Sequence, residues 1–386
     1  MDNLKSIPLR NKLKILFILP ASEIGGAETK TFNLLHSLQS FDRVLVTHSS
    51  IQNYYSKLDI KKYTFESFNC MFPHILSPNN ILTYAKSIKK ISDYEKPDVM
   101  LGIMHFGGLF VIAAHDIFFL KAHPVITIEG NFSAYFESIN RPPSLKEKLL
   151  IRYCFTRTKG IIVPSEGVKR DLVSNYWASE KKVKTIYNGI DIEKVKELSQ
   201  EGIPLKKNCP WIITACRLNA QKDFSTLLKA FRIVRDTIRS KLIIIGDGEL
   251  KEDIKKLSVE LNIDQDVIMT GFHENPFAYI SKGDVFVLSS FYEGFGNVIV
   301  EAMALGIPVI STDCPSGPGE IITDSQNGFL VPIGDFKGMA EKCLMLLNDH
   351  DLRKIILQKG QQRAENFSLH AMRDGFEHYM MGMLKS

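Results

Sequence analysis

Short, uninterrupted apolar runs alternate with helix-length amphipathic segments along the whole of this 386-residue chain. Runs that stay apolar, without alternating polar residues, are typical of parallel strands whose two faces are both covered by helices. The first half holds such runs at 14–19, 43–47, 98–104, 124–128 and 160–163, with amphipathic segments at 27–38 and 81–94. We therefore expect an α/β fold built on a parallel sheet.

The same pattern starts again after residue 210, which indicates a second domain. Apolar runs recur at 211–215, 241–246, 267–270, 284–289 and 308–311, with an amphipathic segment at 224–238. We expect two doubly wound, Rossmann-like domains, at 1–195 and 210–366, and a final helix over 368–386 that crosses back to the first domain. Ligands of such sheets bind at the carboxyl ends of the strands, so the two domains should face a central cleft.

One apolar stretch, 99–120, is long enough to be compared with a membrane span. A span needs about 20 uninterrupted apolar residues, but Gly107 and Gly108 break this stretch, and His115 and Asp116 lie near its end. We predict a buried strand, a glycine turn and a buried helix. The N-terminus lacks the apolar core of a secretory signal, and the six scattered cysteines form no C-x-x-C pair, so we expect a cytoplasmic protein with reduced thiols and no zinc site.

The most informative motif is a pair of carboxylates, Glu293 and Glu301, on either side of a Gly-Phe-Gly turn. A predicted strand precedes the turn and a helix follows it. This order directs free backbone N–H groups and the positive end of a helix dipole at an anion above the strand. A diphosphate suits that position, and carboxylates beside it suit sugar hydroxyls, so the motif favours a nucleotide-sugar enzyme.

Two cations follow the first strand of the second domain, Arg217 and Lys222. They would lie at the carboxyl end of that strand, where they could neutralise a diphosphate. Alone they could equally be surface residues of a turn; the Glu293–Glu301 pair makes the binding role the stronger interpretation. Gly25 and Gly26 follow the first strand of the first domain, where glycine allows a ligand close to the backbone, although a tight structural turn needs the same residues.

Two further loops of the second domain should border the cleft. Phe272 and His273 follow a predicted strand, where they could hold a nucleobase, and a turn-rich loop at 313–320 lies along the same edge. No G-x-G-x-x-G fingerprint accompanies them, which argues against a dinucleotide cofactor.

Charge is shared unevenly between the halves. Residues 1–200 hold 27 Lys and Arg against 19 Asp and Glu, a net charge of +8. Residues 201–386 hold 21 Lys and Arg against 24 Asp and Glu, a net charge of −3. The first half is therefore expected to meet an anionic partner, such as anionic phospholipid or a lipid-linked diphosphate. No basic-aromatic nucleic-acid motif is present, so no nucleic-acid partner is expected. The segment 145–157 mixes apolar and basic residues at helical spacing, which fits either a membrane-surface helix or an ordinary domain helix.

Together these motifs resemble the retaining glycosyltransferases of family 4, which have the GT-B fold. The resemblance is carried, in order, by 25–28, 188–191, Arg217 with Lys222, 246–248, and Glu293 with Glu301. The loop at 314–318 looks like that of a subgroup which often uses UDP-linked galactose or N-acetylhexosamines to build bacterial surface glycans. The resemblance implies that the first domain binds the acceptor and the second binds the nucleotide sugar.

The resemblance also implies roles for single residues. Glu301 would bind the ribose, Glu293 would orient the donor sugar, and Arg217 with Lys222 would stabilise the leaving diphosphate. The Gly25–Gly26 loop would close over the donor, which the second domain would hold through its turn residues Gly294, Phe295, Gly296, Asn297 and Val298. No metal ion and no cofactor are expected, because cations and helix dipoles take that place in this fold.

One departure from the family pattern concerns the acceptor side. Many relatives carry a histidine after the fifth strand of the first domain, where this chain reads Thr-Ile-Glu-Gly-Asn at 127–131. Either Glu129 or Asn131 takes part of that role, or the loop only packs; His105, after the fourth strand, is another candidate for the cleft.

The leading hypothesis is a retaining glycosyltransferase that moves a hexose or N-acetylhexosamine from a UDP-sugar to a lipid-linked or growing surface glycan, such as O-antigen or capsule. It would act at the inner face of the membrane. A nucleotide-sugar epimerase of the same fold and a non-catalytic partner of a glycosyltransferase are the alternatives. The combination of Arg217, Lys222, Glu293 and Glu301 favours a transferase.

Overall fold

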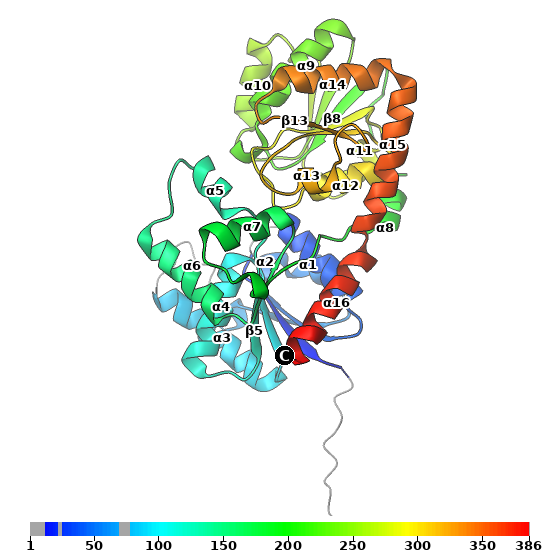
Figure 1. Cartoon of the computed structure of the whole chain (residues 1–386). Helices are drawn as coiled ribbons and strands as arrows, with labels where there is room; N and C mark the ends of the chain where they lie inside the picture. Colours follow the sequence, from blue (N-terminus) through cyan, green and yellow to red (C-terminus); the bar gives the residue numbers. More distant parts are fainter. Residues whose placement is uncertain (1–11, 22–24, 69–77, 386) are drawn as a thin grey trace, which may run out of the picture.

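The computed structural model describes residues 12–21, 25–68 and 78–385, and it forms two α/β domains, one above the other in Figure 1. The first sheet has the strand order β3-β2-β1-β4-β5-β6-β7, and the second has the order β10-β9-β8-β11-β12-β13. Neighbouring strands are parallel throughout both sheets. In each sheet the order turns back at the first strand, as the doubly wound prediction requires.

The strands of the first sheet are β1 (Lys14–Leu19), β2 (Asp42–Thr47), β3 (Lys61–Thr64), β4 (Val99–Gly102), β5 (His123–Thr127), β6 (Gly160–Val163) and β7 (Val183–Thr185). The helices around it are α1 (Gly26–Ser37), α2 (Ser49–Gln52), α3 (Pro78–Glu95), α4 (Met104–Phe118), α5 (Phe132–Ser138), α6 (Leu145–Arg157) and α7 (Glu166–Asn175). A short helix, α8 (Ile192–Leu198), lies in the stretch that joins the domains.

The strands of the second sheet are β8 (Trp211–Ala215), β9 (Lys241–Ile245), β10 (Val267–Gly271), β11 (Val285–Leu288), β12 (Val309–Thr312) and β13 (Phe329–Val331). Its helices are α9 (Phe224–Thr237), α10 (Lys251–Glu260), α11 (Phe277–Ile280), α12 (Asn297–Ala304), α13 (Pro318–Ile321), α14 (Phe336–Asn348) and α15 (His350–Ala364). The last helix, α16 (Leu369–Lys385), follows α15 through a 3-10 turn at Glu365–Phe367.

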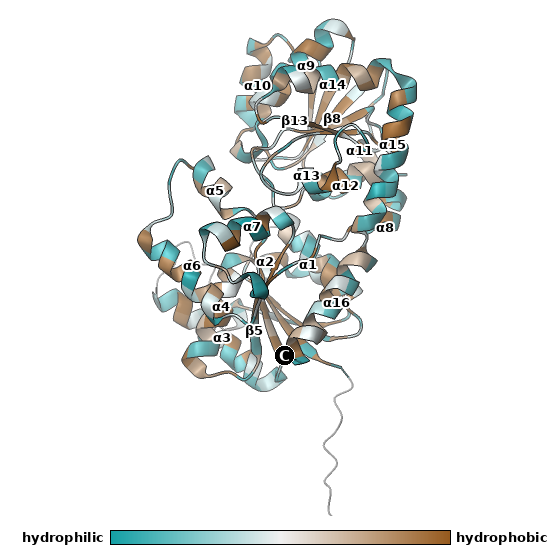
Figure 2. Cartoon of the chain, viewed as in Figure 1, coloured by the Kyte–Doolittle hydropathy of each residue, from teal (hydrophilic) through white to brown (hydrophobic). Residues whose placement is uncertain are grey.

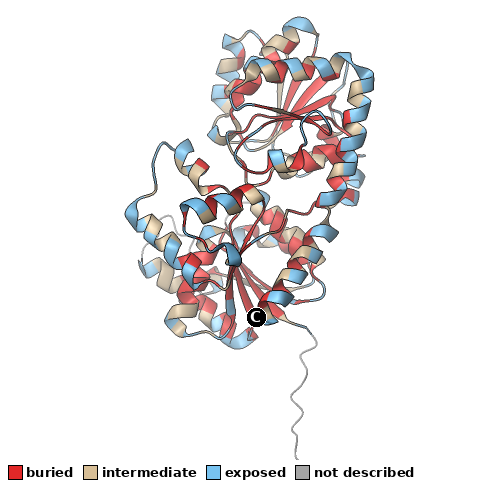
Figure 3. Ribbon diagram, viewed as in Figure 1, coloured by how far each residue is buried: buried red, intermediate tan, exposed pale blue. Residues whose placement is uncertain are grey.

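Burial explains why the strands are apolar along their whole length. Every residue of β1, β4, β6, β11 and β12 is buried, because helices cover both faces of each sheet (Figure 3). In Figure 2 the same strands are mainly hydrophobic, whereas the outer faces of the helices are mainly hydrophilic. This agrees with the parallel-sheet prediction from the apolar runs.

The predicted glycine turn at Gly107–Gly108 was wrong, since both glycines lie inside α4. A Cβ atom on Gly107 would lie 2.7 Å from the Ile18 carbonyl oxygen, and one on Gly108 would lie 2.8 Å from the Ile126 side chain. These residues are glycine because α4 packs closely on the sheet, and β4 ends at Gly102, just before the helix begins. Among the described residues, no helix is both long and apolar enough to cross a membrane.

The final helix belongs to the core of the first domain. Met372, Phe376, Met380 and Met383 of α16 are buried in the same apolar cluster as β1, and the Phe376 ring meets the Phe41 ring edge-on at 6.5 Å. Figure 1 shows α16 beside α1 at the end of the chain. The chain thus crosses between the domains twice, near α8 and again after α15, which limits how the domains can move.

Candidate active site

The ammonium group of Lys222 and the carboxylate of Glu293 form the centre of the site, with Nζ and Oε1 2.5 Å apart. Lys222 follows β8 and Glu293 follows β11, and these parallel strands are neighbours whose carboxyl ends meet at one edge. Burial is the largest single influence on the pKa of Lys222 and lowers it, but the charge and hydrogen bond of Glu293, together with the nearby thiols of Cys216 and Cys314, raise it more in sum, so the net pKa lies above its usual value. A charged lysine is therefore held at the tip of the sheet.

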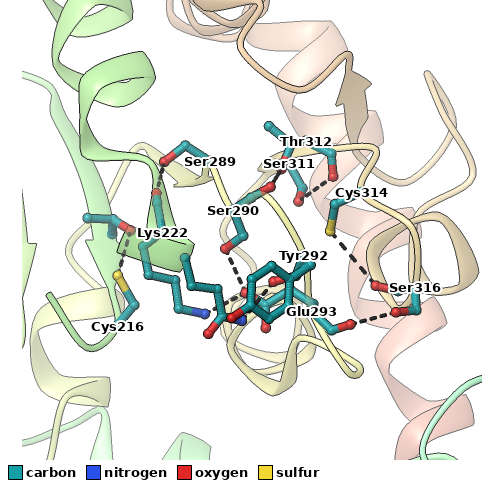
Figure 4. A network of polar contacts seen from close by, with 12 residues as sticks. Cys216, Lys222, Ser289, Ser290, Tyr292, Glu293, Ser311, Thr312, Cys314 and Ser316 are labelled. Carbon is teal, nitrogen blue, oxygen red and sulfur yellow. Dashed lines mark hydrogen bonds and ion pairs between the residues drawn. The ribbon is translucent and has the colours of Figure 1, made fainter. Parts of the chain in front are cut away.

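Serine hydroxyls fix this pair in place, as Figure 4 shows. Ser290 Oγ donates to the same Glu293 oxygen at 2.6 Å, and Ser316 Oγ donates to the Glu293 backbone carbonyl at 2.6 Å. Ser289 Oγ donates to the Lys222 carbonyl at 2.6 Å. Both the side chain and the backbone of Glu293 are thus held, an arrangement that keeps polar groups oriented before a ligand arrives.

The helix after the glycine turn begins without a side-chain cap. Gly296 precedes α12 with a φ of +98°, which suits glycine, and a glycine at this position provides no side chain to cap the helix. Uncapped N–H groups and the positive end of the helix dipole can bind an anion. Asn297, the first residue of α12, accepts a hydrogen bond through its side chain from Asn188 at 2.9 Å. Val298 follows it on the same turn.

Glu301 lies one turn further along α12. It keeps some access to solvent, but surrounding protein removes most of its hydration, which raises its pKa to about 7. Within the described ranges, no hydrogen-bond or ion-pair partner is recorded for its carboxyl group. Such a group can accept hydrogen bonds from a ligand without first breaking a protein contact.

The glycine turn of the first domain reaches the cations of the second. A Cβ atom on Gly25 would lie 3.6 Å from an Arg217 guanidinium nitrogen and 3.2 Å from the Glu28 carboxylate, which accepts a hydrogen bond from the Gly25 N–H at 2.8 Å. Among the described residues, no atom lies within 4 Å of a Cβ atom placed on Gly26. The structure therefore brings Gly25 of the first domain and Arg217 of the second together.

The acceptor-side candidates are placed differently from one another. Glu129 forms an ion pair with Lys30 at 2.9 Å, and its carbonyl oxygen would lie 1.9 Å from a Cβ atom on Gly294. Asn131 is buried and caps α5 by accepting a hydrogen bond from the Ala134 N–H at 2.9 Å, so its amide oxygen already has a structural partner. His105 is exposed in the first turn of α4.

The two candidates for holding a base follow β10. Phe272 is 68% exposed, which is unusual for so large an apolar side chain. His273 packs on Tyr279 with ring centroids 4.4 Å apart, and its buried Nε2 atom has no hydrogen-bond partner among the described residues. A ligand could therefore pack on the exposed Phe272 ring and form a hydrogen bond with His273 Nε2.

Sequence reasoning missed three residues that complete this arrangement. Ser290 and Ser316 hold Glu293, and Glu320 joins the second domain to α7 of the first. The only sequence signal for the last two was the turn-rich loop at 313–320. Within the described ranges, no three His, Cys, Asp or Glu residues gather in a way that could hold a metal ion.

Comparison with known proteins decides the family. The profile described as "Glycosyltransferase Family 4" matches residues 24–194, and "Glycosyl transferases group 1" matches residues 195–363. The chain belongs to glycosyltransferase family 4.

Its curated relatives include the N-acetylgalactosamine-N,N'-diacetylbacillosaminyl-diphospho-undecaprenol 4-alpha-N-acetylgalactosaminyltransferase of Campylobacter jejuni, 34% identical over 93% of this chain and 96% of that protein. CapM of Staphylococcus aureus, a capsular polysaccharide biosynthesis glycosyltransferase, is 32% identical over 58% of this chain and 60% of its own.

Solved structures agree on the fold of this family 4 enzyme. A glycosyltransferase of Rickettsia africae superposes with a TM-score of 0.80 at 20% identity, covering 97% of this chain and 100% of that one. HepE of Anabaena, solved with UDP and glucose, superposes with a TM-score of 0.78 at 18% identity, covering 96% and 99%. The two parallel α/β domains therefore form the GT-B fold, as the resemblance implied.

Proposed function

We propose that this glycosyltransferase moves a hexose or N-acetylhexosamine from a UDP-sugar to a lipid-linked glycan, with retention of anomeric configuration and without a metal ion or other cofactor. The observation that carries the proposal is the Lys222–Glu293 pair at the tip of the second sheet, beside the uncapped start of α12. N-acetylgalactosamine is the first sugar to test, because the Campylobacter relative is named for its transfer to a diphospho-undecaprenol acceptor.

The donor fits the second domain in three parts. The diphosphate would lie between Arg217, Lys222 and the N–H groups of α12, where positive charge is concentrated. The Glu301 carboxyl would accept hydrogen bonds from the ribose. The exposed Phe272 ring and the unpartnered His273 nitrogen would contact the uracil.

The reaction breaks the bond between the anomeric carbon and the diphosphate oxygen. Negative charge grows on that oxygen, and the fixed cations stabilise it more in the transition state than in the bound donor. The acceptor hydroxyl would attack from the same face and pass its proton to the departing diphosphate. Glu293 is already held by Lys222 and Ser290, which suits a fixed acceptor for donor-sugar hydroxyls better than a covalent nucleophile.

The acceptor would approach over the first domain, near Glu129 and His105. The exposed face of α6 supports contact with an anionic membrane, because Leu145, Leu149 and Tyr153 recur at four-residue spacing and are all exposed. Arg152 of the same helix lies 5.8 Å from the exposed Trp177 ring. Apolar side chains beside basic ones are suited to the interface of an anionic bilayer.

Vesicle binding tests this membrane contact. We expect the protein to sediment with vesicles that contain phosphatidylglycerol and to bind phosphatidylcholine vesicles much less. Leu145→Ser with Leu149→Ser should lower binding to the anionic vesicles several-fold. Equal sedimentation of this variant and the wild type would exclude α6 as the contact.

A panel of UDP-, GDP- and ADP-sugars, incubated with the purified protein in EDTA, tests the donor. Selective slow hydrolysis of one UDP-sugar supports the proposal. Interconversion of the sugar without its release would support the epimerase alternative. Binding without either reaction, even with a lipid-linked acceptor present, would support the non-catalytic alternative.

A further inference from the structure

The loop at 313–320 touches the first domain at one end and the active site at the other. Its last residue, Glu320, accepts hydrogen bonds through its two carboxylate oxygens from the N–H groups of Glu166 at 2.7 Å and Gly167 at 2.8 Å. These N–H groups open α7 of the first domain, and they are directed at a carboxylate that belongs to the second. A carboxylate at a helix N-terminus makes charge-assisted hydrogen bonds and interacts favourably with the helix dipole.

Close packing accompanies these hydrogen bonds. A Cβ atom on Gly167 would lie 2.6 Å from Ser316 Cβ and 2.7 Å from the Pro315 carbonyl oxygen. Only glycine at position 167 lets the loop come this near to α7. The contact is therefore specific in shape as well as in charge.

The loop is anchored firmly within the second domain. Arg363 of α15 donates to the Glu320 carbonyl at 2.6 Å and to the Ile321 carbonyl at 3.0 Å, and its guanidinium lies 4.9 Å from the Phe367 ring. Burial, together with the nearby Glu320 carboxylate, raises the pKa of Tyr187 to about 12, so this tyrosine stays neutral beside the contact. The backbone at Glu320 is therefore fixed to the second domain, which presents its carboxylate to α7.

The other end of the loop holds the donor-site backbone. Ser316, which packs on Gly167, donates its hydroxyl to the Glu293 carbonyl. Gly317 has a φ of +92°, and a Cβ atom there would lie 2.1 Å from the Phe295 carbonyl oxygen. One short loop thus contacts α7, Glu293 and Phe295, which come from both domains.

We propose that Glu320 is an interdomain latch: its contact with the N-terminus of α7 holds the two domains closed, and the loop at 313–320 carries that closure to Glu293 through Ser316. Glu320 is then a positioning residue, and it acts on the donor through Glu293. The link to turnover rests on the function proposed above, whereas the latch itself can be tested without any substrate. In many enzymes, domain closure brings the catalytic groups together, so that the reaction takes place only when the domains are closed.

Two variants test the two contacts separately: that of Glu320 with α7, and that of Ser316 with Glu293. Glu320→Ala removes the latch, so the amides of Glu166 and Gly167 should exchange hydrogen at least tenfold faster, and the radius of gyration in solution should rise. Turnover of the UDP-sugar should fall about 10- to 100-fold, as expected when two charge-assisted hydrogen bonds are lost. Ser316→Ala cuts only the link to Glu293, so it should keep the wild-type radius of gyration and lower turnover at least several-fold.

Glu341→Gln, at an exposed position of α14, is the matched control and should behave as the wild type in all three measurements. Glu320→Gln keeps one acceptor oxygen and should fall between the wild type and Glu320→Ala. Wild-type exchange and radius of gyration in Glu320→Ala would overturn the latch, and wild-type turnover in Ser316→Ala would overturn the relay. If the wild type turns over no UDP-sugar, the proposed function fails, while the exchange and scattering results still decide the latch.

Discussion

Lys222 and Glu293 are separated by 70 intervening residues, yet their side chains meet at 2.5 Å because the strands that precede them are neighbours in the sheet. The pair is nearly buried, and Ser290 gives the same carboxylate oxygen a second donor. A cation held this firmly is suited to stabilising the negative charge that develops on the departing diphosphate during the reaction. This relationship is the basis of the first prediction.

Lys222→Ala should lower the rate of sugar transfer by about 100-fold or more, the size expected when one preorganised charge contact is lost. The measurement is kcat with saturating UDP-sugar. Lys359→Ala, at an exposed position of α15, is the control and should retain full activity. A Lys222→Ala enzyme within twofold of the wild type would remove this lysine from the mechanism.

Gly294→Ala should block full approach of the domains, because the new Cβ atom would lie 1.9 Å from the Glu129 carbonyl oxygen. The clash lies between domains, so each domain should still fold. We expect turnover to fall at least tenfold, since small displacements of reacting groups are costly, while the melting temperature changes little. The control is Gly202→Ala, where a Cβ atom meets no atom within 4 Å. Unchanged turnover in Gly294→Ala would show that this contact is not needed.

Glu301 should make stability depend on pH. Burial raises its pKa from 4.5 to about 7, so its contribution to stability is fully present below about pH 4.5 and is lost as the pH rises through about 7. In the absence of donor, the free energy of unfolding of the wild type should therefore fall over this range relative to Glu301→Gln. Denaturant unfolding of both proteins from pH 4.5 to pH 8 measures the difference. Parallel curves would show that Glu301 has an ordinary pKa.

Much of this architecture was predictable from the sequence, because continuous apolar runs mark buried parallel strands wherever they are long enough. The strands β3, β7 and β13 were missed, because lysines interrupt the apolar pattern in β3 and β7 and because β13 has only three residues. Gly107 and Gly108 were misread because glycine serves close helix packing as well as turns, and sequence alone does not distinguish the two.

The site was predictable as far as its motifs are local. Lys222 and Glu293 each follow a strand, so their meeting follows from the order of the sheet. The Lys30–Glu129 pair and the contact of Glu320 with α7 join segments about 100 to 150 residues apart. The Lys30–Glu129 contact depends on how distant segments of the first domain pack, and the Glu320 contact depends on how the two domains are placed. No local pattern encodes either placement.

Glu95 should be important for stability and not for chemistry. It is 2% exposed and accepts hydrogen bonds from Lys14 at 2.9 Å, Tyr63 at 2.6 Å and Lys61 at 3.1 Å. Glu95→Ala removes the buried partner of Lys14, which keeps only the half-exposed Asp42 carboxylate at 3.2 Å, so we expect a loss of about 3 kcal/mol in the free energy of unfolding. Denaturant titration measures this loss, and Glu197→Ala on exposed α8 surface is the control. A loss below about 1 kcal/mol, typical of a surface ion pair, would contradict the assigned burial.

The most direct test of the central claim is one transfer reaction, run in EDTA with UDP-N-acetylgalactosamine and a diphospho-lipid glycan acceptor, with the product linkage read by NMR. The account predicts turnover without metal and an α-linked product, which is retention from the α-linked donor. A β-linked product, or a reaction that starts only when a divalent metal is added, would contradict it.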